Sequence, residues 1–172
     1  MKKKQILYLV VGVTIILFGV IGFVVSKKPA DPEKVHYHAG FVVFENGKKL
    51  NFSDNKYMFI KPCTIDGEEI ENPGDEQIEK AHLHDNVGDV IHIEEEGAIW
   101  RDLFTNINFP VDYSKVEAYI NGEIVPNFES QSIKSNDSLV LFFGSVDKSL
   151  LSQAPTKEYI EEWGKKSSTC GD

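Results

Sequence analysis

Apolar residues form one long uninterrupted run near the start of the chain and shorter, alternating runs after it. The twenty residues from Ile6 to Val25 carry no charge and are mostly Ile, Leu, Val and Phe. A helix of that length measures about 30 Å, which matches the hydrocarbon core of a bilayer. The pattern therefore predicts a transmembrane helix that anchors the chain in a membrane through residues 6–25.

The charges beside this run predict its orientation. Three lysines, Lys2 to Lys4, precede it together with the amino terminus, and two, Lys27 and Lys28, follow it. The N-terminus is expected in the cytoplasm, because the more positive flank stays there. A secretory signal has a shorter apolar core and a small-residue cleavage site. We therefore expect an uncleaved anchor and a single-pass protein of the cytoplasmic membrane, with the rest of the chain outside.

One folded domain is expected after the anchor. Residues 1–28 form the signal-anchor, 29–35 form a short linker, and 36–172 are long enough for an extracytoplasmic domain with a core. All 27 acidic residues lie after residue 30, against 13 of the 18 Lys and Arg. This balance argues against nucleic acid as a partner, since nucleic acid selects for basic patches.

Alternating apolar residues predict two β-hairpins. Residues 36–44 and 48–52 flank Asn46-Gly47, and residues 115–120 and 123–125 flank Asn121-Gly122. Asn-Gly supplies the two positive-φ positions that a tight hairpin turn requires.

The remaining elements follow from the same patterns. Strands are predicted over 56–60, 89–95 and 137–144, the last of them central because it is strongly apolar. Residues 64–80 carry seven acids and few apolar side chains, which predicts a mobile surface loop. Helices are predicted over 98–109, where Ile99, Leu103 and Ile107 recur at helical spacing, and over 156–166.

Two hairpins with one helix between them indicate an α+β fold. We expect one β-grasp-like domain, a mixed sheet with one packed helix, followed by a C-terminal helix. A β-sandwich is the alternative. The central helix is expected to bury Trp100, Leu103, Phe104 and Ile107 against Phe41, Val43, Tyr119, Leu141 and Phe143.

All five histidines fall into two short patches, which makes them the candidate site. His36 and His38 form one His-x-His pair, His82 and His84 form another, and His92 follows in a predicted strand. Residues i and i+2 of a strand point to the same side, so each pair shares a face if its segment is extended. Imidazole suits several divalent transition metals without any thiolate. We therefore predict a metal site, with solvated surface histidines as the simpler alternative.

Two carboxylates accompany these histidines. Asp85 directly follows His84 and is placed to accept the N–H of a ligating imidazole. In the strand around His92, Ile91 is expected to face the core, so that His92 and Glu94 look outward, where a ligand can reach them. Histidines with a nearby carboxylate favour zinc or copper as the metal. The residue order of a blue-copper site and the His-Glu-x-x-His helix of zinc proteases are both missing.

The chain has two cysteines, Cys63 and Cys170. Outside the cytoplasm a pair of cysteines usually forms a disulfide, which we expect here, with free thiols or cysteine ligands to a metal as the alternatives. The bridge would close a loop of about a hundred residues and contribute about 4–5 kcal/mol in the chain-entropy model. No Cys-x-x-Cys pair is present to indicate a redox enzyme.

Several motifs together resemble a poorly characterised family of membrane-anchored, exported prokaryotic proteins. They are "HYHAGFVVFENG", "KYMFIKPC", "EKAHLHDNVGDVIHIE", "WRDLFTNINF", "YINGE" and "SSTCG", which span nearly the whole predicted ectodomain. The resemblance implies no assigned activity. It implies that the five histidines and two cysteines stand at positions characteristic of the family. Members often carry a second histidine where this chain has Glu94, so a carboxylate is a candidate substitute there.

Three functions fit the sequence. The first is a membrane-tethered extracytoplasmic protein that binds Zn or Cu, with the acidic segment 64–80 raising the local cation concentration. The second is a metal-dependent enzyme with an open coordination position, in which Glu94 or Asp85 acts as a base. The third is an envelope interaction domain that binds no metal.

Overall fold

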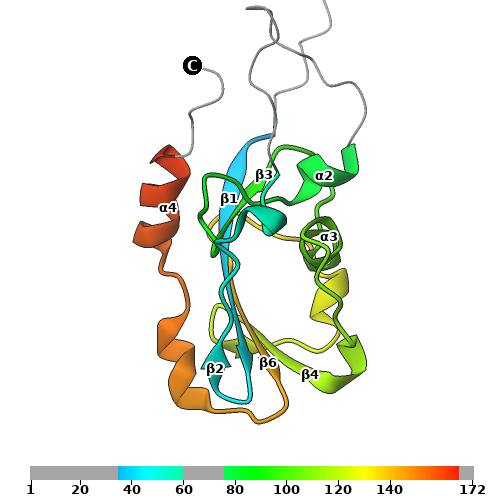
Figure 1. The fold of residues 1–172 in the computed structure, drawn as a ribbon, viewed down its shortest axis with the longest axis vertical. Helices are drawn as coiled ribbons and strands as arrows, with labels where there is room; N and C mark the ends of the chain where they lie inside the picture. Colours follow the sequence, from blue (N-terminus) through cyan, green and yellow to red (C-terminus); the bar gives the residue numbers. More distant parts are fainter. Residues whose placement is uncertain (1–34, 60–75, 167–172) are drawn as a thin grey trace, which may run out of the picture. The chain divides into compact units, whose positions relative to one another are not determined.

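The computed structural model describes residues 35–59 and 76–166, all of which belong to one compact unit, Lys34–Asp172. The strands are β1 Tyr37–Glu45, β2 Lys48–Lys49, β3 Val90–Ile93, β4 Val116–Ile120, β5 Glu123–Ile124 and β6 Ser138–Phe143. The α-helices are α2 Glu76–Lys80, α3 Trp100–Asn106 and α4 Lys157–Lys166 (Figure 1). The 3-10 helices in the described ranges are η1 Asn55–Tyr57, η2 Tyr113–Lys115, η3 Phe128–Ser130 and η4 Lys148–Gln153.

A mixed sheet forms the centre of the domain. Its strand order is β2-β1-β6-β4-β5, and β3 also pairs with β1. Strands β1 and β6 run parallel, and the other pairs are antiparallel. The α+β class with a mixed sheet is thus confirmed, and the path of hairpin, helix, hairpin and central last strand is consistent with a β-grasp-like arrangement. The alternative of two packed sheets is not seen, since the described strands form one sheet.

The two predicted hairpin turns have the backbone that their sequences require. Asn46 and Gly47 have φ of 50° and 82°, and Asn121 and Gly122 have φ of 53° and 82°. Positive φ at both central positions is the geometry of the turn that best fits the twist of two paired strands. The hairpins set the register of β1 with β2 and of β4 with β5.

The main core lies between the sheet and α3. Alternate residues of β1 point to this side, and Trp100, Leu103 and Phe104 of α3 pack against them, as the sequence predicted. Tyr119 was expected in this core, but that prediction is wrong. Alternation along β4 directs Ala118 towards α3 and Tyr119 to the opposite face.

The C-terminal segment covers that opposite face of β1. Leu150 and Leu151 of η4 pack on the apolar cluster of this face, which consists of Val42, Phe44, Tyr119, Val140 and Phe142. Further along, a Cβ added to Gly40 would lie 2.6 Å from Cβ of Pro155, so only glycine permits this approach. Figure 1 shows η4 and α4 running beside the sheet on the side away from α3.

Two predicted elements are wrong where the structure describes them. The strand expected over 56–60 is replaced at its start by η1, because the side chain of Asp54 accepts a hydrogen bond from the backbone N of Lys56 and caps this turn. The end of the loop expected over 64–80 is helix α2. Its backbone is tied down by Asn106, whose Nδ2 donates to the carbonyls of Gln77 and Ala81.

Some predictions concern residues outside the described ranges. The anchor helix over 6–25, residues 60–75 and both cysteines, Cys63 and Cys170, are among them. In the described ranges, every helix is too short or too polar to cross a bilayer.

Candidate metal centre

Strand pairing brings His38 and His92 together. They are direct partners in the antiparallel pair of β1 and β3. Phe41 N donates to Asp89 O in the same ladder, and hydrogen-bonded pairs alternate along it, so His38 and His92 form a pair whose backbones are not bonded to each other. Side chains approach most closely at such pairs. His38 Nε2 lies 3.1 Å from His92 Nδ1.

The segment after α2 adds His82 to the other edge of β3. His82 and His92 exchange both backbone hydrogen bonds, with N···O distances of 3.0 and 2.9 Å. Residues directly opposite in a ladder project from the same face. His38, His92 and His82 therefore stand in a row across three adjacent segments, on the face of the sheet that α4 covers.

The remaining two histidines join this row because each lies two residues from one of its members. His36 precedes His38, and its ring centroid is 4.9 Å from that of His38 and 5.9 Å from that of His92. His84 follows His82, and its ring centroid is 3.7 Å from that of His92. All five imidazoles predicted as site residues thus gather around His92.

Three of the five can hold one metal ion. His36, His38 and His92 each offer one nitrogen, and these three nitrogens lie within 4.8 Å of one another. We call these residues the histidine triad, and His82 and His84 the outer pair. Neither the outer pair nor Glu94 belongs to this set in the structure.

Hydrogen bonds fix which nitrogen of each outer histidine carries the lone pair. His82 Nδ1 lies 3.2 Å from the carbonyl oxygen of Ile78, and His84 Nδ1 lies 2.7 Å from Oδ2 of Asp85. Both oxygens only accept, so Nδ1 is the donor in each neutral ring and the lone pair is on Nε2. The Asp85 contact is the one that the sequence predicted, whereas the Ile78 carbonyl leaves no signal in the sequence.

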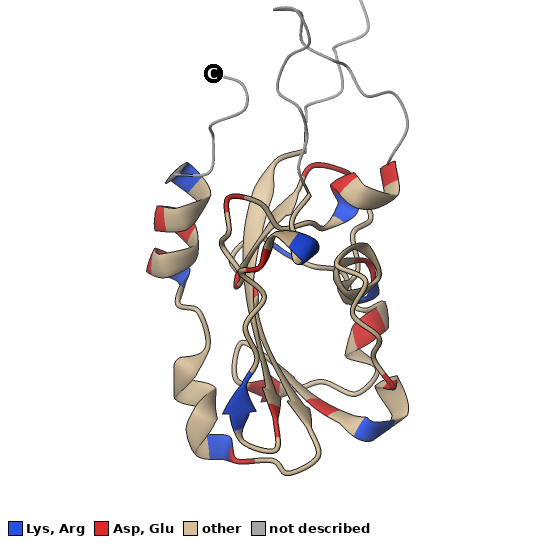
Figure 2. Cartoon of the chain, viewed as in Figure 1, with Lys and Arg blue, Asp and Glu red and all other residues tan. Residues whose placement is uncertain are grey.

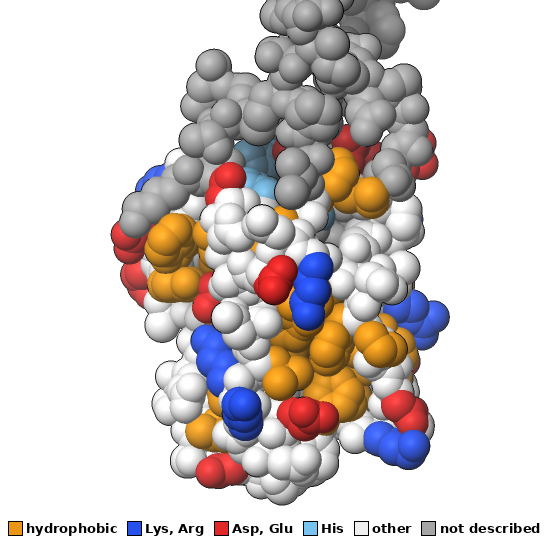
Figure 3. All heavy atoms as spheres, viewed as in Figure 1, with side chains coloured by type: hydrophobic (Ala, Val, Ile, Leu, Met, Phe, Trp, Pro, Cys, Tyr) orange, Lys and Arg blue, Asp and Glu red, His pale blue; other side chains and the backbone are white. Residues whose placement is uncertain are grey.

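Burial differs within the triad. His92 is 5% exposed, His38 is half-buried and His36 is exposed. His92 faces away from the core that holds Ile91 and Ile93, as expected, but its side chain is not open to solvent, because the rings of His38, His82 and His84 lie close to it. Figure 3 shows imidazole atoms at the surface in the upper part of the view, so the cluster as a whole reaches solvent.

The surroundings keep the two inner triad members neutral. Burial, followed by the charges that neighbouring imidazoles would carry, lowers the pKa of His38 to about 4, while Glu94 acts in the opposite direction. Burial also lowers the pKa of His92 well below its usual range, and the nearby His84 lowers it further. At neutral pH both rings therefore have a lone pair to offer to a metal.

Helix α4 forms a wall beside His38. A Cβ added to Gly164 would lie 2.6 Å from His38 Nδ1 and 2.9 Å from its Cε1, so the helix backbone lies against the imidazole ring. The helix is fixed to the sheet by Ile160, which is fully buried, and by the Tyr159 hydroxyl, which donates to Asp89 Oδ1 at 2.9 Å. No pattern in the sequence singled out Gly164.

Acidic residues occur near the histidines. Helices α2 and α4 both carry them (Figure 2), and Glu94, Glu95 and Glu96 directly follow β3. Acidic side chains lower the electrostatic potential for an approaching cation.

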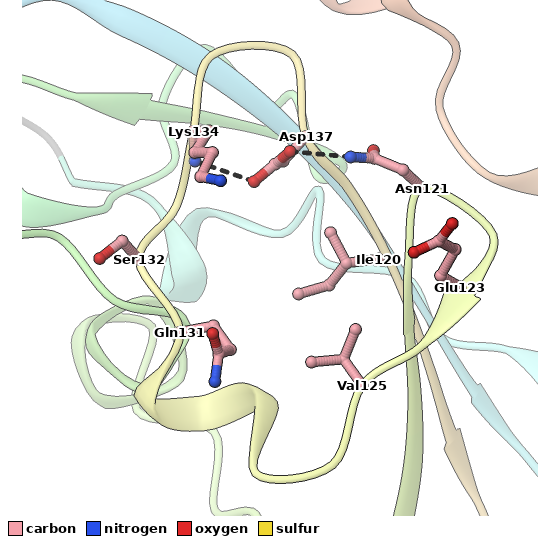
Figure 4. A pocket seen from close by; sticks show the side chains of 8 residues that line it. All are labelled: Ile120, Asn121, Glu123, Val125, Gln131, Ser132, Lys134 and Asp137. Atoms are coloured by element: carbon pink, nitrogen blue, oxygen red, sulfur yellow. Dashed lines mark hydrogen bonds between the residues drawn. The ribbon is translucent and has the colours of Figure 1, made fainter.

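A separate hollow of about 510 Å³ lies between the β4–β5 hairpin and the segment before β6, and none of the histidines lines it. Figure 4 shows the Asp137 carboxylate held by Asn121 Nδ2 and by the backbone N of Lys134, both at 2.9 Å. Because these polar groups satisfy each other, they fix the local backbone and belong to the fold.

Compared with known proteins, the chain matches no family model, no curated protein and no solved structure. The candidate site therefore rests on its own geometry.

Proposed function

We propose that this protein is a membrane-tethered, extracytoplasmic metal-binding protein that holds a divalent zinc or copper ion with its clustered histidines. The observation that carries the proposal is the convergence of His36, His38 and His92, whose ligand nitrogens lie within 4.8 Å of one another. Imidazole nitrogens are good donors for both metals, and no thiolate is required.

The distances support this proposal. Two nitrogens bound tetrahedrally to zinc at the usual bond length lie about 3.3 Å apart. His38 Nε2 and His92 Nδ1 are 3.1 Å apart, so binding requires little movement of these two rings. The third member, His36, is exposed and is therefore the ring best able to move inward as an ion binds.

The outer pair has a supporting role in this proposal. His84 and its partner Asp85 form the imidazole–carboxylate arrangement that commonly orients a metal ligand. With its lone pair on Nε2 and its ring against His92, His84 is the candidate for a fourth ligand. His82, held by Ile78, packs the cluster from the other edge of β3.

Metal analysis of the full-length chain tests the proposal. The chain is purified in mild detergent without an affinity tag, loaded with Zn²⁺ or Cu²⁺ alone, and freed of loosely bound ions. We expect about one ion per chain and none in the double variant His38→Ala/His92→Ala. The matched control is Asn51→Ala/Asn55→Ala, an exposed pair outside the cluster. Equal uptake by wild type and the histidine variant would refute the site.

A metal-dependent enzyme is the second candidate, and the number of triad ligands favours it. Catalytic zinc sites keep three protein ligands and leave one position for water, whereas structural sites use four. The triad supplies three nitrogens in the structure. X-ray absorption of the loaded protein separates the two candidates, since a water-derived oxygen at the metal favours catalysis and a fourth imidazole favours storage or capture.

The tether and the compartment are part of the same proposal, supported by the apolar run 6–25 and its flanking lysines. In intact cells freed of their outer wall, added protease should remove the histidine-containing domain. Protection of that domain until the membrane is lysed would place it in the cytoplasm and contradict the proposal.

A further inference from the structure

Helix α4 and strand β1 meet closely at two positions, and both involve glycine. On the strand, a Cβ added to Gly40 would lie 2.6 Å from Pro155 and 3.0 Å from Ile160. On the helix, a Cβ added to Gly164 would lie 2.6 to 2.9 Å from three atoms of the His38 ring. Gly40 and His38 lie two residues apart on the same face of β1. The packing of Pro155 and Ile160 on Gly40 therefore fixes where α4 lies along β1, and this position brings Gly164 against His38.

Two further contacts hold α4 in this position against the sheet. The Tyr159 hydroxyl donates to Asp89, the residue directly before β3, and Ile160 has no exposed surface. They lie five and four residues before Gly164, and they link α4 to the two strands that carry His38 and His92. The helix, β1 and β3 thus form one packed unit around the imidazole pair.

We propose that Gly164 is a positioning residue for the metal site and that α4 is the wall that selects Nε2 of His38 as the ligand atom. This inference rests on the proposed function. A Cβ at position 164 would lie 2.6 Å from Nδ1, so the helix passes close to this side of the ring, while Nε2 lies 3.1 Å from His92 Nδ1 on the side of the cluster. A side chain at position 164 would push the ring out of this orientation.

The substitution Gly164→Ala gives a test with opposite expectations for the two possible roles of this glycine. Alanine is a better helix former than glycine, so if Gly164 has no contact role, the variant has a more stable α4 and binds metal as before. If Gly164 positions His38, the variant loses affinity for Zn²⁺ by about tenfold or more, the range typical of residues that orient ligands. Affinity is measured by competition with a chelating dye on the full-length chain.

A metal-free measurement tests the contact itself. In the metal-free chain we expect Gly164→Ala to lower the unfolding temperature when His38 is present and to raise it in a His38→Ala background, where the ring no longer fills the space. The imidazole ¹⁵N shifts of His38 should also change with Gly164→Ala. Glu161→Ala, on the exposed side of the same helix, is the matched control and should leave affinity and shifts unaltered.

A second variant guards against a failure of Gly164→Ala to fold. Tyr159→Phe removes the hydrogen bond to Asp89 without adding bulk and loosens the helix. It should weaken Zn²⁺ binding by a smaller factor than Gly164→Ala and keep the ¹⁵N shifts near those of wild type.

The outcomes separate this inference from the proposed function. If wild type binds Zn²⁺ and both Gly164→Ala and Tyr159→Phe bind it equally tightly, the inference is overturned and the metal site stands. If wild type binds neither Zn²⁺ nor Cu²⁺, the proposed function fails and the positioning role fails with it. Loss of affinity together with the sign reversal in the His38→Ala background supports the inference.

Discussion

His38 and His92 are direct partners on neighbouring strands, with His38 Nε2 3.1 Å from His92 Nδ1. In the metal-free chain one of these nitrogens donates to the other, so at least one ring must be reorganised or lose a proton from that nitrogen when both bind an ion. Because both rings are already neutral at neutral pH, this proton can move to the other nitrogen of the same ring, and metal binding by the pair is expected to weaken only in acid, where protons compete for the ligand nitrogens.

Single changes in the triad should affect metal affinity more than changes in the outer pair. His92→Ala removes the ring at the centre of the cluster, and we expect it to lower Zn²⁺ affinity by more than roughly 100-fold, the upper end for residues that only orient a ligand. His82→Ala should lower affinity by less. Isothermal titration of both variants checks this order, and the reverse order would contradict the assignment of the triad.

Asp85→Asn tests the role of the imidazole–carboxylate contact. The amide has a similar shape but lacks the charge that strengthens the hydrogen bond from His84 Nδ1, now 2.7 Å long. We expect Zn²⁺ affinity to fall by about 10- to 100-fold if His84 is a ligand. Asp147→Asn is the matched control, since Asp147 caps η4 and asparagine also caps well. An unchanged affinity in Asp85→Asn would remove His84 from the ligand set.

The stability of the metal-free chain should fall between neutral pH and about pH 4. The unfolded pKa of histidine is about 6.5 and that of folded His38 is about 4, so the unfolded state binds the proton first as the pH falls. The stability linked to this ring is thus complete above pH 6.5 and lost by about pH 4. We expect it to be about 1–2 kcal/mol, because solvent screens the partly exposed ring.

Urea unfolding of wild type and His38→Gln at several pH values, with a chelator present, checks this expectation. Glutamine does not titrate, so the variant should lose less stability across the same range. Parallel curves for the two proteins would show that His38 has an ordinary pKa in the folded chain.

Leu103→Ala separates the stability of the fold from the chemistry of the site. Leu103 has no exposed surface and lies in the core between α3 and the sheet, on the face opposite the histidines. We expect the unfolding free energy to fall by about 2–5 kcal/mol. The metal content of the folded fraction should stay at the wild-type level, and a parallel loss of metal would show that the two faces are coupled.

A disulfide between Cys63 and Cys170 remains a prediction from the sequence. Mass analysis without reduction should find the two residues joined, and the free energy of unfolding should drop by about 4–5 kcal/mol on reduction in the chain-entropy model. Two alkylatable thiols in the native protein would contradict it.

The sequence predicted the elements near the site better than their contacts. Asn-Gly turns and alternating residues are local signals, so both hairpins and the strand of His92 could be placed from the sequence. The meeting of His38 with His92 depends on a strand pair 54 residues apart, and no local pattern contains that register.

The predictions that were wrong or missed also depend on contacts between segments that are distant in the sequence. Tyr119 was placed in the main core, but the register of β4 with β6 directs Ala118 to that side. The burial of His92 could not be predicted either, because imidazoles from two other segments, β1 and the segment after α2, pack around it. Gly164 was missed since a glycine within a polar helix carries no sign of what its backbone touches.

X-ray absorption at the metal edge of the Zn²⁺-loaded, full-length chain tests the central claim most directly. A first shell of at least three nitrogen donors at about 2.0–2.1 Å, with the outer-shell scattering of imidazole rings, is the predicted result. A shell of oxygen donors without imidazole scattering would contradict the claim that these histidines hold the ion.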